Sequence, residues 1–384
     1  MSFVRVLMVA LGSAVCSSAL HTQQASTSRA ELAAAYMRMD NAYAAASPTL
    51  SDSARAAINV QFDRSTLSFF VGKFATALAI IDSGTRRLTQ QPLAAPPPRP
   101  TRVVSGRTAS VWREGFLARL AKVDSTGPLA QAWVSARARA ELLVDEPSPE
   151  RTAELLSDPA TLTRDLAREV LAIERGRNPY VGQAYDAWRT FRGAGGALIP
   201  FRIVAPTAAA ISGSPVPVII ALHGAGGDEN MFVDAYGAGA LASLALNANA
   251  ILITPATTPF AASPENFDSV MTVLRSEYRV NGGRVYVLGH SMGATAAARL
   301  AQLRPQQIAA VACLAGGAAV TVSKAPAVLF IGATLDPIAR PSVVKAAATS
   351  SPTGRYEELA NEGHTLMVLN AVQRAVPWLL QHRP

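Results

Sequence analysis

The C-terminal half of the chain contains a serine between two glycines, in the segment VYVLGHSMGATAAAR at positions 285–299. Ser291 follows a run of branched and aromatic residues that favours a β-strand, and it precedes an alanine-rich run that favours an α-helix. The letters GHSMG match the pattern G-x-S-x-G, in which a strained turn between a strand and a helix exposes a serine. The glycines remove side chains that would clash in that turn, so the pattern predicts an exposed nucleophilic hydroxyl.

A serine hydroxyl is a poor nucleophile without a neighbouring base, so the residues that follow it are decisive. Beyond Ser291 the chain has one aspartate, Asp336, and two histidines, His364 and His382. Asp336 follows the apolar run APAVLFIGATL and His364 follows GRYEELANEG, so both are expected just past strand ends, with His364 opening a helix. We predict that His364 accepts the Ser291 proton and that Asp336 orients its imidazole. His382 lies near the chain terminus and is interpreted as a surface residue.

Three glutamates are alternative partners for the predicted base. Glu357 and Glu358 lie within a predicted strand, and Glu362 is close in sequence to His364, so Asp336 is the preferred acid. A glycine-rich turn, HGAGGDE at 223–229, follows another apolar strand and frees backbone N–H groups. The N–H groups of Ala225 and Met292 are the predicted donors to a developing oxyanion.

Two further histidines lie close to these motifs in the sequence. His223 precedes the glycine-rich turn and is interpreted as a structural residue that holds the loop by hydrogen bonds. His290 lies within the turn GHSMG, which we call the elbow, and is interpreted as a packing or rim residue. Neither is predicted to act as the base.

From residue 179 onward, strands and helices alternate in the pattern that predicts an α/β domain with a mostly parallel sheet covered by helices on both faces. The segment YDAWRTFRGAGGALIPFRIVAP predicts an initial antiparallel hairpin, with GAGG as its turn rather than a phosphate-binding loop. The predicted strands are 216–222, 250–254, 284–288, 308–315, 325–332 and 354–360. The predicted helices are 265–279, 291–303, 339–349 and 364–382.

The elements before this domain are predicted to be helical, in the ranges 26–90 and 103–178, separated by a proline-rich linker over 91–102. Ser51 and Asp52 suit a helix start, and Gly84 suits a helix end. This half contains no catalytic constellation. Packing, oligomerisation and shaping of access to a neighbouring site are all compatible with it.

Composition narrows the class of protein. Hydrophobic residues make up 49% of the 384 residues and charged residues 16%, which is globular. The net charge of +8 is spread without a basic cluster, so no nucleic-acid partner is predicted. No transmembrane span, cofactor or metal is predicted, and the oligomeric state stays open. Cys313 lies in an apolar run and is interpreted as a buried structural thiol.

Residues 1–25 have the layout of a secretory signal peptide, with Arg5 followed by an apolar stretch and then small residues. We therefore expect an exported protein, secreted or periplasmic. Ala19 and Ala25 are candidate cleavage positions, and lipidation of Cys16 stays open.

The motifs LHGAGGDE, RVYVLGHSMGA, GATLDPI and EGH, in this order, resemble the α/β-hydrolase superfamily over residues 180–384. They are most similar to secreted esterases near the polyhydroxybutyrate-depolymerase, feruloyl-esterase and dienelactone-hydrolase groups, and also to prolyl-oligopeptidase-type peptidases. Many members carry a sizeable insertion between the strand before the catalytic acid and an earlier helix, which acts as a lid. Only 73 positions separate Ser291 from His364 here, so the N-terminal helices are the expected cover.

The resemblance implies metal-free hydrolysis of a carboxylic ester through an acyl-enzyme at Ser291, Asp336 and His364. From the sequence we expect turnover of short acyl esters and little amide cleavage. A serine peptidase of the prolyl-oligopeptidase type and a non-catalytic binding protein on the same fold are the alternatives.

Overall fold

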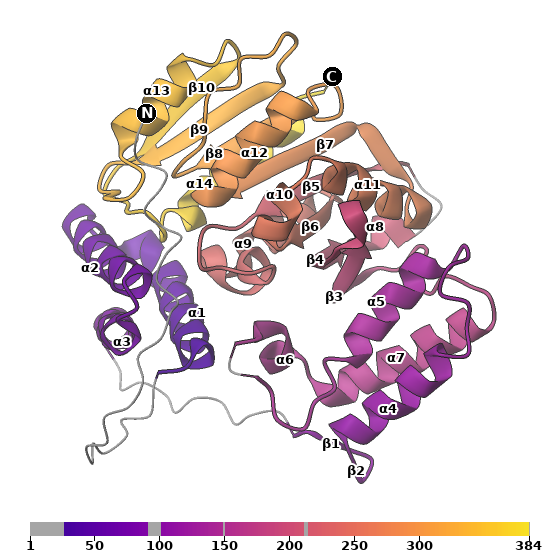
Figure 1. Ribbon diagram of the computed structural model, residues 1–384. Helices are drawn as coiled ribbons and strands as arrows, with labels where there is room; N and C mark the ends of the chain where they lie inside the picture. The colour runs from indigo at the N-terminus through magenta and orange to yellow at the C-terminus, as the bar shows by residue number, and fades with distance from the viewer. Residues whose placement is uncertain (1–26, 91–100, 149, 211–213, 384) are drawn as a thin grey trace, which may run out of the picture.

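We describe a computed structural model of the chain for residues 27–90, 101–148, 150–210 and 214–383 (Figure 1). The predicted signal peptide and most of the predicted linker lie outside the described residues. Figure 1 shows two groups of N-terminal helices, one beside the C-terminal part of the sheet and one beside β3 and β4. A large sheet with its own helices forms the rest of the molecule.

The sheet has eight strands in the order β10-β9-β8-β7-β5-β6-β4-β3. The six strands from β5 to β10 pair in parallel, whereas β4 runs antiparallel to both β3 and β6. The prediction of a mostly parallel sheet with an antiparallel start is therefore confirmed. The strands are β3 Tyr185–Arg192, β4 Leu198–Ala205, β5 Val216–Leu222, β6 Ile251–Pro255, β7 Val280–His290, β8 Ala310–Leu314, β9 Ala327–Ala333 and β10 Gly354–Leu359.

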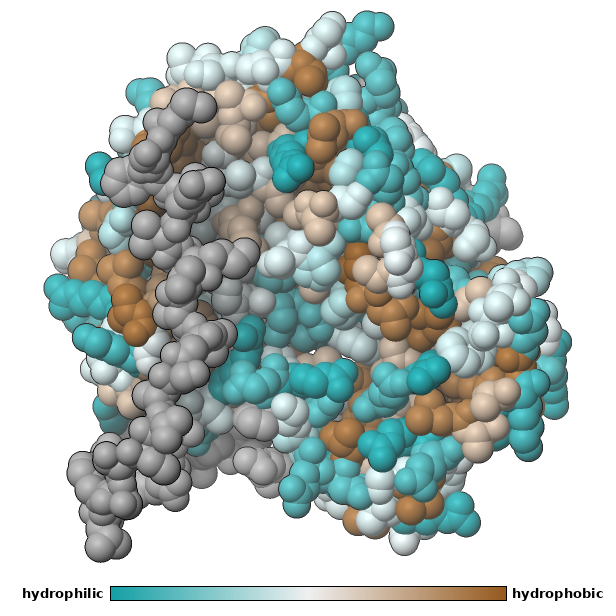
Figure 2. Space-filling model, viewed as in Figure 1, coloured by the Kyte–Doolittle hydropathy of each residue, from teal (hydrophilic) through white to brown (hydrophobic). Residues whose placement is uncertain are grey.

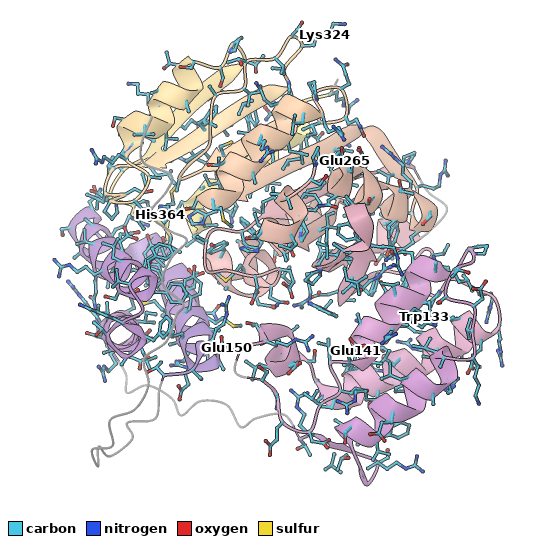
Figure 3. The ribbon with its side chains drawn as sticks, in the orientation of Figure 1. Trp133, Glu141, Glu150, Glu265, Lys324 and His364 are labelled. Carbon is cyan, nitrogen blue, oxygen red and sulfur yellow. The ribbon has the colours of Figure 1, made fainter. Side chains whose placement is uncertain are left out.

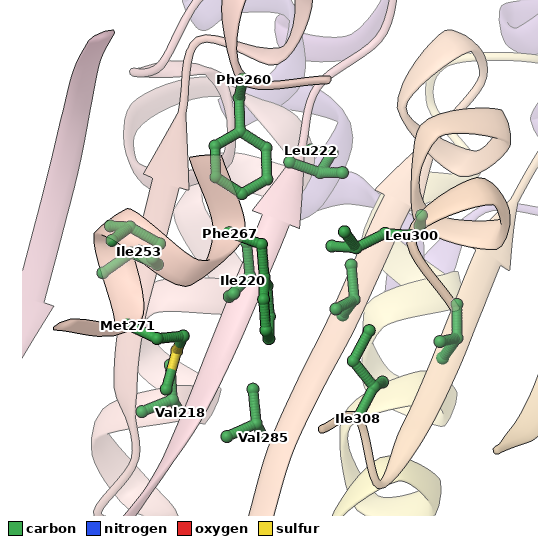
Figure 4. Packing of buried hydrophobic residues seen from close by; sticks show 14 of the residues in the cluster. Val218, Ile220, Leu222, Ile253, Phe260, Phe267, Met271, Val285, Leu300 and Ile308 are labelled. Carbon is green, nitrogen blue, oxygen red and sulfur yellow. The ribbon is translucent and has the colours of Figure 1, made fainter. Parts of the chain in front are cut away.

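Helices cover both faces of this sheet because its central strands are apolar on both sides. On β5, Val218, Ile220 and Leu222 face α11 and α12, as Figure 4 shows, while the alternate residues face α9 and α14. The four predicted helices correspond to α11, α12, α13 and α14, whereas α8, α9 and α10 were not predicted. The helices are α8 Thr207–Ala210, α9 Ala240–Asn247, α10 Thr257–Ala261, α11 Glu265–Glu277, α12 Met292–Leu303, α13 Pro341–Thr349 and α14 Val368–Gln381, with short turns η2 Ala194–Gly196, η3 Met231–Ala235 and η4 Tyr236–Gly239.

The first helical group consists of α1 Arg29–Ala46, α2 Asp52–Phe70 and α3 Phe74–Thr89, with a short turn η1 Ser47–Thr49. Ser51 caps α2, since its hydroxyl accepts the N–H of Ala54. The predicted helix end at Gly84 is wrong, because α3 continues to Thr89. A Cβ at Gly84 would lie 3.0 Å from Cε of Met39, so this glycine permits close packing of α3 on α1.

The second helical group packs beside β3, which is an edge strand of the sheet. The Ser135 hydroxyl and the Gln131 amide, both on α5, donate to the carbonyl oxygen of Thr190 at 2.7 and 2.8 Å. These contacts cover a strand edge that would otherwise be free to pair with another chain. The group comprises β1 Val103–Val104, β2 Arg107–Thr108, α4 Ala109–Leu120, α5 Ala130–Ala140, α6 Thr152–Leu156 and α7 Pro159–Glu174.

The surface seen in the orientation of Figure 1 is mixed in character (Figure 2). Hydrophilic residues are spread over this face, with smaller hydrophobic patches between them. Among the described residues, none of the helices has the length and apolar character needed to cross a membrane.

Candidate active site

The turn between β7 and α12 holds Ser291 in a strained backbone conformation. Ser291 has φ of 55° and ψ of −117°, a region that side-chain-bearing residues rarely occupy, and its N–H donates to the Leu314 carbonyl at 2.9 Å. The surrounding backbone leaves no room for a side chain at either flanking glycine. A Cβ on Gly289 would lie 2.1 Å from the carbonyl oxygen of Gly293, and a Cβ on Gly293 would lie 1.9 Å from that of Leu222.

The structure brings the three residues predicted for catalysis together. His364 Nε2 lies 3.0 Å from the Ser291 hydroxyl oxygen, and His364 Nδ1 lies 2.8 Å from Asp336 Oδ2. Asp336 Oδ1 accepts the N–H groups of Ile338 and Ala339, each at 2.8 Å, so the carboxylate is fixed on both sides. Since the carboxylate accepts a proton from Nδ1, the Nε2 lone pair faces the serine hydroxyl.

His364 lies in a turn and not at the start of a helix, because α14 begins only at Val368. The prediction of a helix from residue 364 is therefore wrong by four residues. The turn lets the imidazole reach Ser291 while His364 itself stays 2% exposed. Figure 3 labels His364 at the junction between the sheet unit and the first helical group.

The glycine-rich loop after β5 lies against the elbow. A Cβ on Gly224 would lie 3.3 Å from Cβ of Ser291, and Ala225 lines the same cavity as Ser291. Met292 opens α12, so its N–H belongs to the first turn, where backbone donors lack partners within the helix. The Met292 side chain itself points elsewhere and does not line the cavity.

A chain of hydrogen bonds joins the glycine-rich loop to the turn that carries His364. The Gly224 N–H donates to the Tyr236 hydroxyl at 3.3 Å, and that hydroxyl lies 3.1 Å from His290 Nδ1. His290 Nε2 lies 2.9 Å from the His364 carbonyl oxygen, so Nε2 carries the proton and Nδ1 accepts from Tyr236. Burial, with a smaller contribution from His364, lowers the pKa of His290 to about 3. His290 is therefore a neutral packing residue that fixes two loops.

The contacts of His223 also indicate a structural role. Its Nε2 accepts the Thr257 N–H at 2.9 Å, so its Nδ1 carries the proton and donates to the Gly224 carbonyl at 2.8 Å. Burial lowers the pKa of His223, which favours this neutral form. Both ring nitrogens hold backbone groups of the loop, and neither is directed at Ser291.

The first helical group contributes polar contacts that sequence reasoning missed. The Asp63 carboxylate on α2 accepts the backbone N–H of His364 at 3.1 and 2.9 Å, and Asn59 Oδ1 accepts the N–H of Gly363 at 2.8 Å. Burial raises the pKa of Asp63 to about 7, even though the His364 N–H acts in the opposite direction. No local sequence motif predicts a role at the site for Asn59 or Asp63, because each is a single polar residue on a helix without a functional pattern.

Glu362, one of the alternative acids, is also held by the first helical group. The Tyr43 hydroxyl lies 2.8 Å from Glu362 Oε2, and Arg55 Nη1 lies 3.1 Å from Oε1. Asn370 donates to Oε1 as well, at 2.6 Å. Glu362 is therefore engaged away from His364. The other two alternatives lie on β10, where Arg355 pairs with Glu357 at 2.9 Å and Tyr356 donates to Glu358.

A cavity opens over Ser291 between the sheet unit and the N-terminal helices. It measures about 1020 Å³ when counted out to its mouth. Its floor is formed by Ser291, His364 and the glycine-rich loop, and its walls come from α1, α2, α3 and α6 together with η3 and η4. Within the described part of the chain, no group of three or more His, Cys, Asp or Glu side chains is placed to hold a metal ion.

No family model matches the chain, and no curated protein sequence does. Solved structures with a similar trace include a thermostable esterase, 20% identical over 52% of this chain and 63% of its own, with a TM-score of 0.42. An S-formylglutathione hydrolase from Staphylococcus aureus is 13% identical over 51% of this chain and 98% of its own, with a TM-score of 0.42. A prolyl endopeptidase is 16% identical over 53% of this chain and 39% of its own, with a TM-score of 0.39.

These likenesses are low, and the chain spans less than two thirds of the thermostable esterase. The fold is defined instead by the strand order, by the parallel crossovers from β5 to β10, and by the strained turn between β7 and α12. Together they form an α/β-hydrolase fold. What such a site acts on has to be argued from its residues.

Proposed function

We propose that the protein is a serine hydrolase that cleaves carboxylic esters through an acyl-enzyme on Ser291. The observation that carries the proposal is the continuous alignment of Ser291, His364 and Asp336, with distances of 3.0 and 2.8 Å. These distances lie within hydrogen-bond reach, which proton transfer between nucleophile and base requires. The strained backbone at Ser291 supports the same role, because strain of this kind is characteristic of functional positions.

In the proposed mechanism, the Ser291 hydroxyl oxygen attacks the ester carbonyl carbon while its proton passes to His364 Nε2. The buried Asp336 carboxylate stabilises the imidazolium that forms. The N–H groups of Ala225 and Met292 donate to the oxyanion, and a donor of this kind contributes roughly 3–4 kcal/mol in the transition state. His364 then protonates the departing alcohol oxygen, which leaves an ester of Ser291. A water molecule, deprotonated by His364, then attacks that ester. The bond to the Ser291 oxygen breaks as His364 returns the proton to it, which releases the carboxylic acid.

Covalent labelling tests this function directly. A fluorophosphonate probe is expected to label the wild-type chain and the Ser342→Ala variant, which changes an exposed serine on α13. Ser291→Ala is expected to remove the labelling. Labelling that persists without Ser291, or that is absent from the folded wild type, would contradict the proposal.

A substrate panel separates the ester hydrolase from the serine peptidase. We expect p-nitrophenyl esters to be turned over in a manner that depends on Ser291, and p-nitroanilide peptides to be cleaved at least about a hundredfold more slowly. Comparable rates on both would favour the peptidase. Binding of esters without turnover would favour a non-catalytic role.

We also propose that residues 1–25 direct export of the chain. The proposal rests on the order of a basic residue, an apolar stretch and small residues at this end of the sequence. Mass spectrometry of the N-terminal peptide after expression in a secreting bacterial host is the test. A mature terminus following Ala19 or Ala25 is expected, and an uncut cytoplasmic chain would contradict it. The same spectrum reveals whether Cys16 carries a lipid.

A further inference from the structure

The walls of the cavity above Ser291 are mainly apolar, and most of them come from the N-terminal helices, with Met231 and Ala235 of η3 added from the part of the chain that carries the sheet. Six of the larger side chains that line it come from four helices: Leu32 and Met37 on α1, Phe62 and Phe69 on α2, Ile81 on α3 and Leu156 on α6. Phe62 and Ile81 are 2% and 5% exposed, so the cavity reaches into the interior of the first helical group. None of these residues belongs to the sheet unit that carries the triad.

The charged side chains that line the cavity are already engaged with other groups. Arg29 donates to the carbonyl oxygen of Gly226 at 2.9 Å, and Asp234 pairs with Arg202 at 2.8 Å. Asp228 accepts the backbone N–H of Asn230 at 2.9 Å. The cavity therefore offers a bound molecule mainly apolar contact, although the hydroxyl-bearing residues Ser65, Thr66 and Thr152 also line it. A site of this kind favours apolar ligands with one polar group.

The position of the walls relative to the reacting groups indicates which part of an ester they would contact. The glycine-rich loop, which would receive the oxyanion, packs against α2, since a Cβ on Gly226 would lie 2.5 Å from the ring of Phe69. The alcohol oxygen has to face His364 Nε2 to receive its proton. The part of the wall beside the loop, around Phe69, is therefore available to the substituent on the carbonyl carbon, which is the acyl chain.

We propose that α1, α2, α3 and α6 form an acyl-binding pocket, and that the substrate is an ester with an apolar acyl chain longer than acetyl. The inference rests on the proposed function. It also revises the expectation of short acyl esters drawn from the sequence. Burial of one methylene group stabilises a complex by about 0.8 kcal/mol, which corresponds to roughly a fourfold gain in kcat/KM for each methylene buried in the transition state.

The test compares p-nitrophenyl acetate, butyrate and octanoate, together with an acetate series in which the alcohol is lengthened instead. In the wild type, kcat/KM is expected to rise at least about tenfold from acetate to octanoate, and to change less than about threefold along the alcohol series. A rise along the alcohol series alone would assign the pocket to the leaving group. Equal rates on all acyl chains would also overturn the proposal.

Two neighbouring alanines on α1 provide a matched pair of variants. Ala33 lines the cavity, whereas Ala34 has a similar partial exposure and does not line it. We expect Ala33→Leu to reduce kcat/KM for octanoate at least about tenfold and for acetate less than about threefold, while Ala34→Leu changes neither. An unchanged chain-length profile in a folded Ala33→Leu protein would overturn the proposal.

A third variant keeps the proposal testable if Ala33→Leu does not fold. Met37→Ala enlarges the cavity from the same helix, and it is expected to shift the preference from octanoate towards dodecanoate. A preference that does not move would count against the pocket. Loss of Ser291-dependent turnover on every ester would instead overturn the proposed function, so the two failures are distinguishable.

Discussion

The Asp63 carboxylate on α2 accepts the backbone N–H of His364, with oxygen–nitrogen distances of 3.1 and 2.9 Å. The bond joins the first helical group to the turn that carries the proposed base. Asn59, one turn earlier on the same helix, accepts the neighbouring N–H of Gly363 at 2.8 Å. The N-terminal helices therefore fix the backbone from which the imidazole reaches Ser291, in addition to lining the cavity.

We expect Asp63→Ala to reduce kcat about 10- to 100-fold while KM changes less than about threefold. A small displacement of a catalytic group can have an effect of this size, and the substitution leaves the His364 N–H without its acceptor. Asp63→Asn is expected to lose less, because its amide oxygen can still accept that N–H. Steady-state kinetics of both variants check the prediction.

Asp52→Ala is the control for Asp63, since Asp52 is exposed on the same helix. It is expected to leave kcat unchanged. A rise in KM without a fall in kcat for Asp63→Ala would assign Asp63 to the pocket instead of to the positioning of His364.

The two histidines after Ser291 are expected to differ sharply. His364→Ala should lower kcat/KM for a p-nitrophenyl ester by more than about 10³-fold, because it removes the base that faces the nucleophile. His382 contacts the Trp378 carbonyl through Nδ1 at 2.8 Å, close to the chain terminus and away from Ser291. His382→Ala should therefore leave kcat/KM within about twofold of wild type. Equal losses in the two variants would show that the base is misassigned.

Substitution of two glycines on β7 by alanine is expected to change the free energy of unfolding by very different amounts. Gly289→Ala places a Cβ 2.1 Å from the Gly293 carbonyl oxygen, whereas Gly282→Ala meets no atom within 4 Å. We expect Gly289→Ala to lower the free energy of unfolding by about 3 kcal/mol or more, since backbone has to move to accept it. Gly282→Ala is expected to stay within about 0.5 kcal/mol. Thermal and urea unfolding measure both, and similar stabilities would contradict the packing described for the elbow.

Asp40 on α1 predicts a pH dependence of stability. It is 1% exposed, and neither carboxylate oxygen has a hydrogen bond of good geometry. Burial raises the pKa of Asp40 from 3.8 to about 8, and the nearby backbone amides of Ala238 and Gly237 offset this only in part. The folded chain thus binds a proton more tightly than the unfolded chain. The free energy of unfolding should fall as the pH rises from about 4 to about 8.

Asp40→Asn removes this titration while keeping the shape of the side chain. Relative to wild type, we expect the variant to gain about 2 kcal/mol or more in the free energy of unfolding between pH 5 and pH 8.5. Because Asp63 is present in both proteins, its own titration cancels in the difference. Asp52→Asn is the control for removing one carboxylate. A difference that is independent of pH would mean that Asp40 is already ionised at pH 5.

The sheet unit could be predicted from the sequence because its signals are local. Five apolar runs marked the parallel strands from β5 to β9, and the boundaries of β5 were predicted to the residue. Asp336 and His364 could be found because each directly follows a strand, and parallel strands bring their carboxyl ends to one edge. The helix α9 was missed because the segment between β5 and β6 mixes alanine with glycine and asparagine, without a clear helical period. The helix α10, which follows β6, was missed because its five residues are too few to show a period.

The contacts between the two ends of the chain could not be predicted in this way. Asn59 and Asp63 are polar residues one turn apart on α2. Polar residues at this spacing are typical of a helix face that is exposed to solvent. Their importance depends on which loop the helix packs against, and that is a tertiary property. Gly84 illustrates the same limit, since its local signal indicated a helix end whereas its packing against Met39 requires a small residue inside α3.

The bond between Asp63 and His364 spans 301 positions of the sequence. The residues of α2 are synthesised long before the turn that they contact. Asn59 and Asp63 therefore lack their hydrogen-bond partners until nearly the whole chain has been made. Contacts between such distant segments form late in folding, because a long loop has to close first. The proposed base is thus among the last groups to reach its working position. A chain that ends before residue 364 would lack the proposed base.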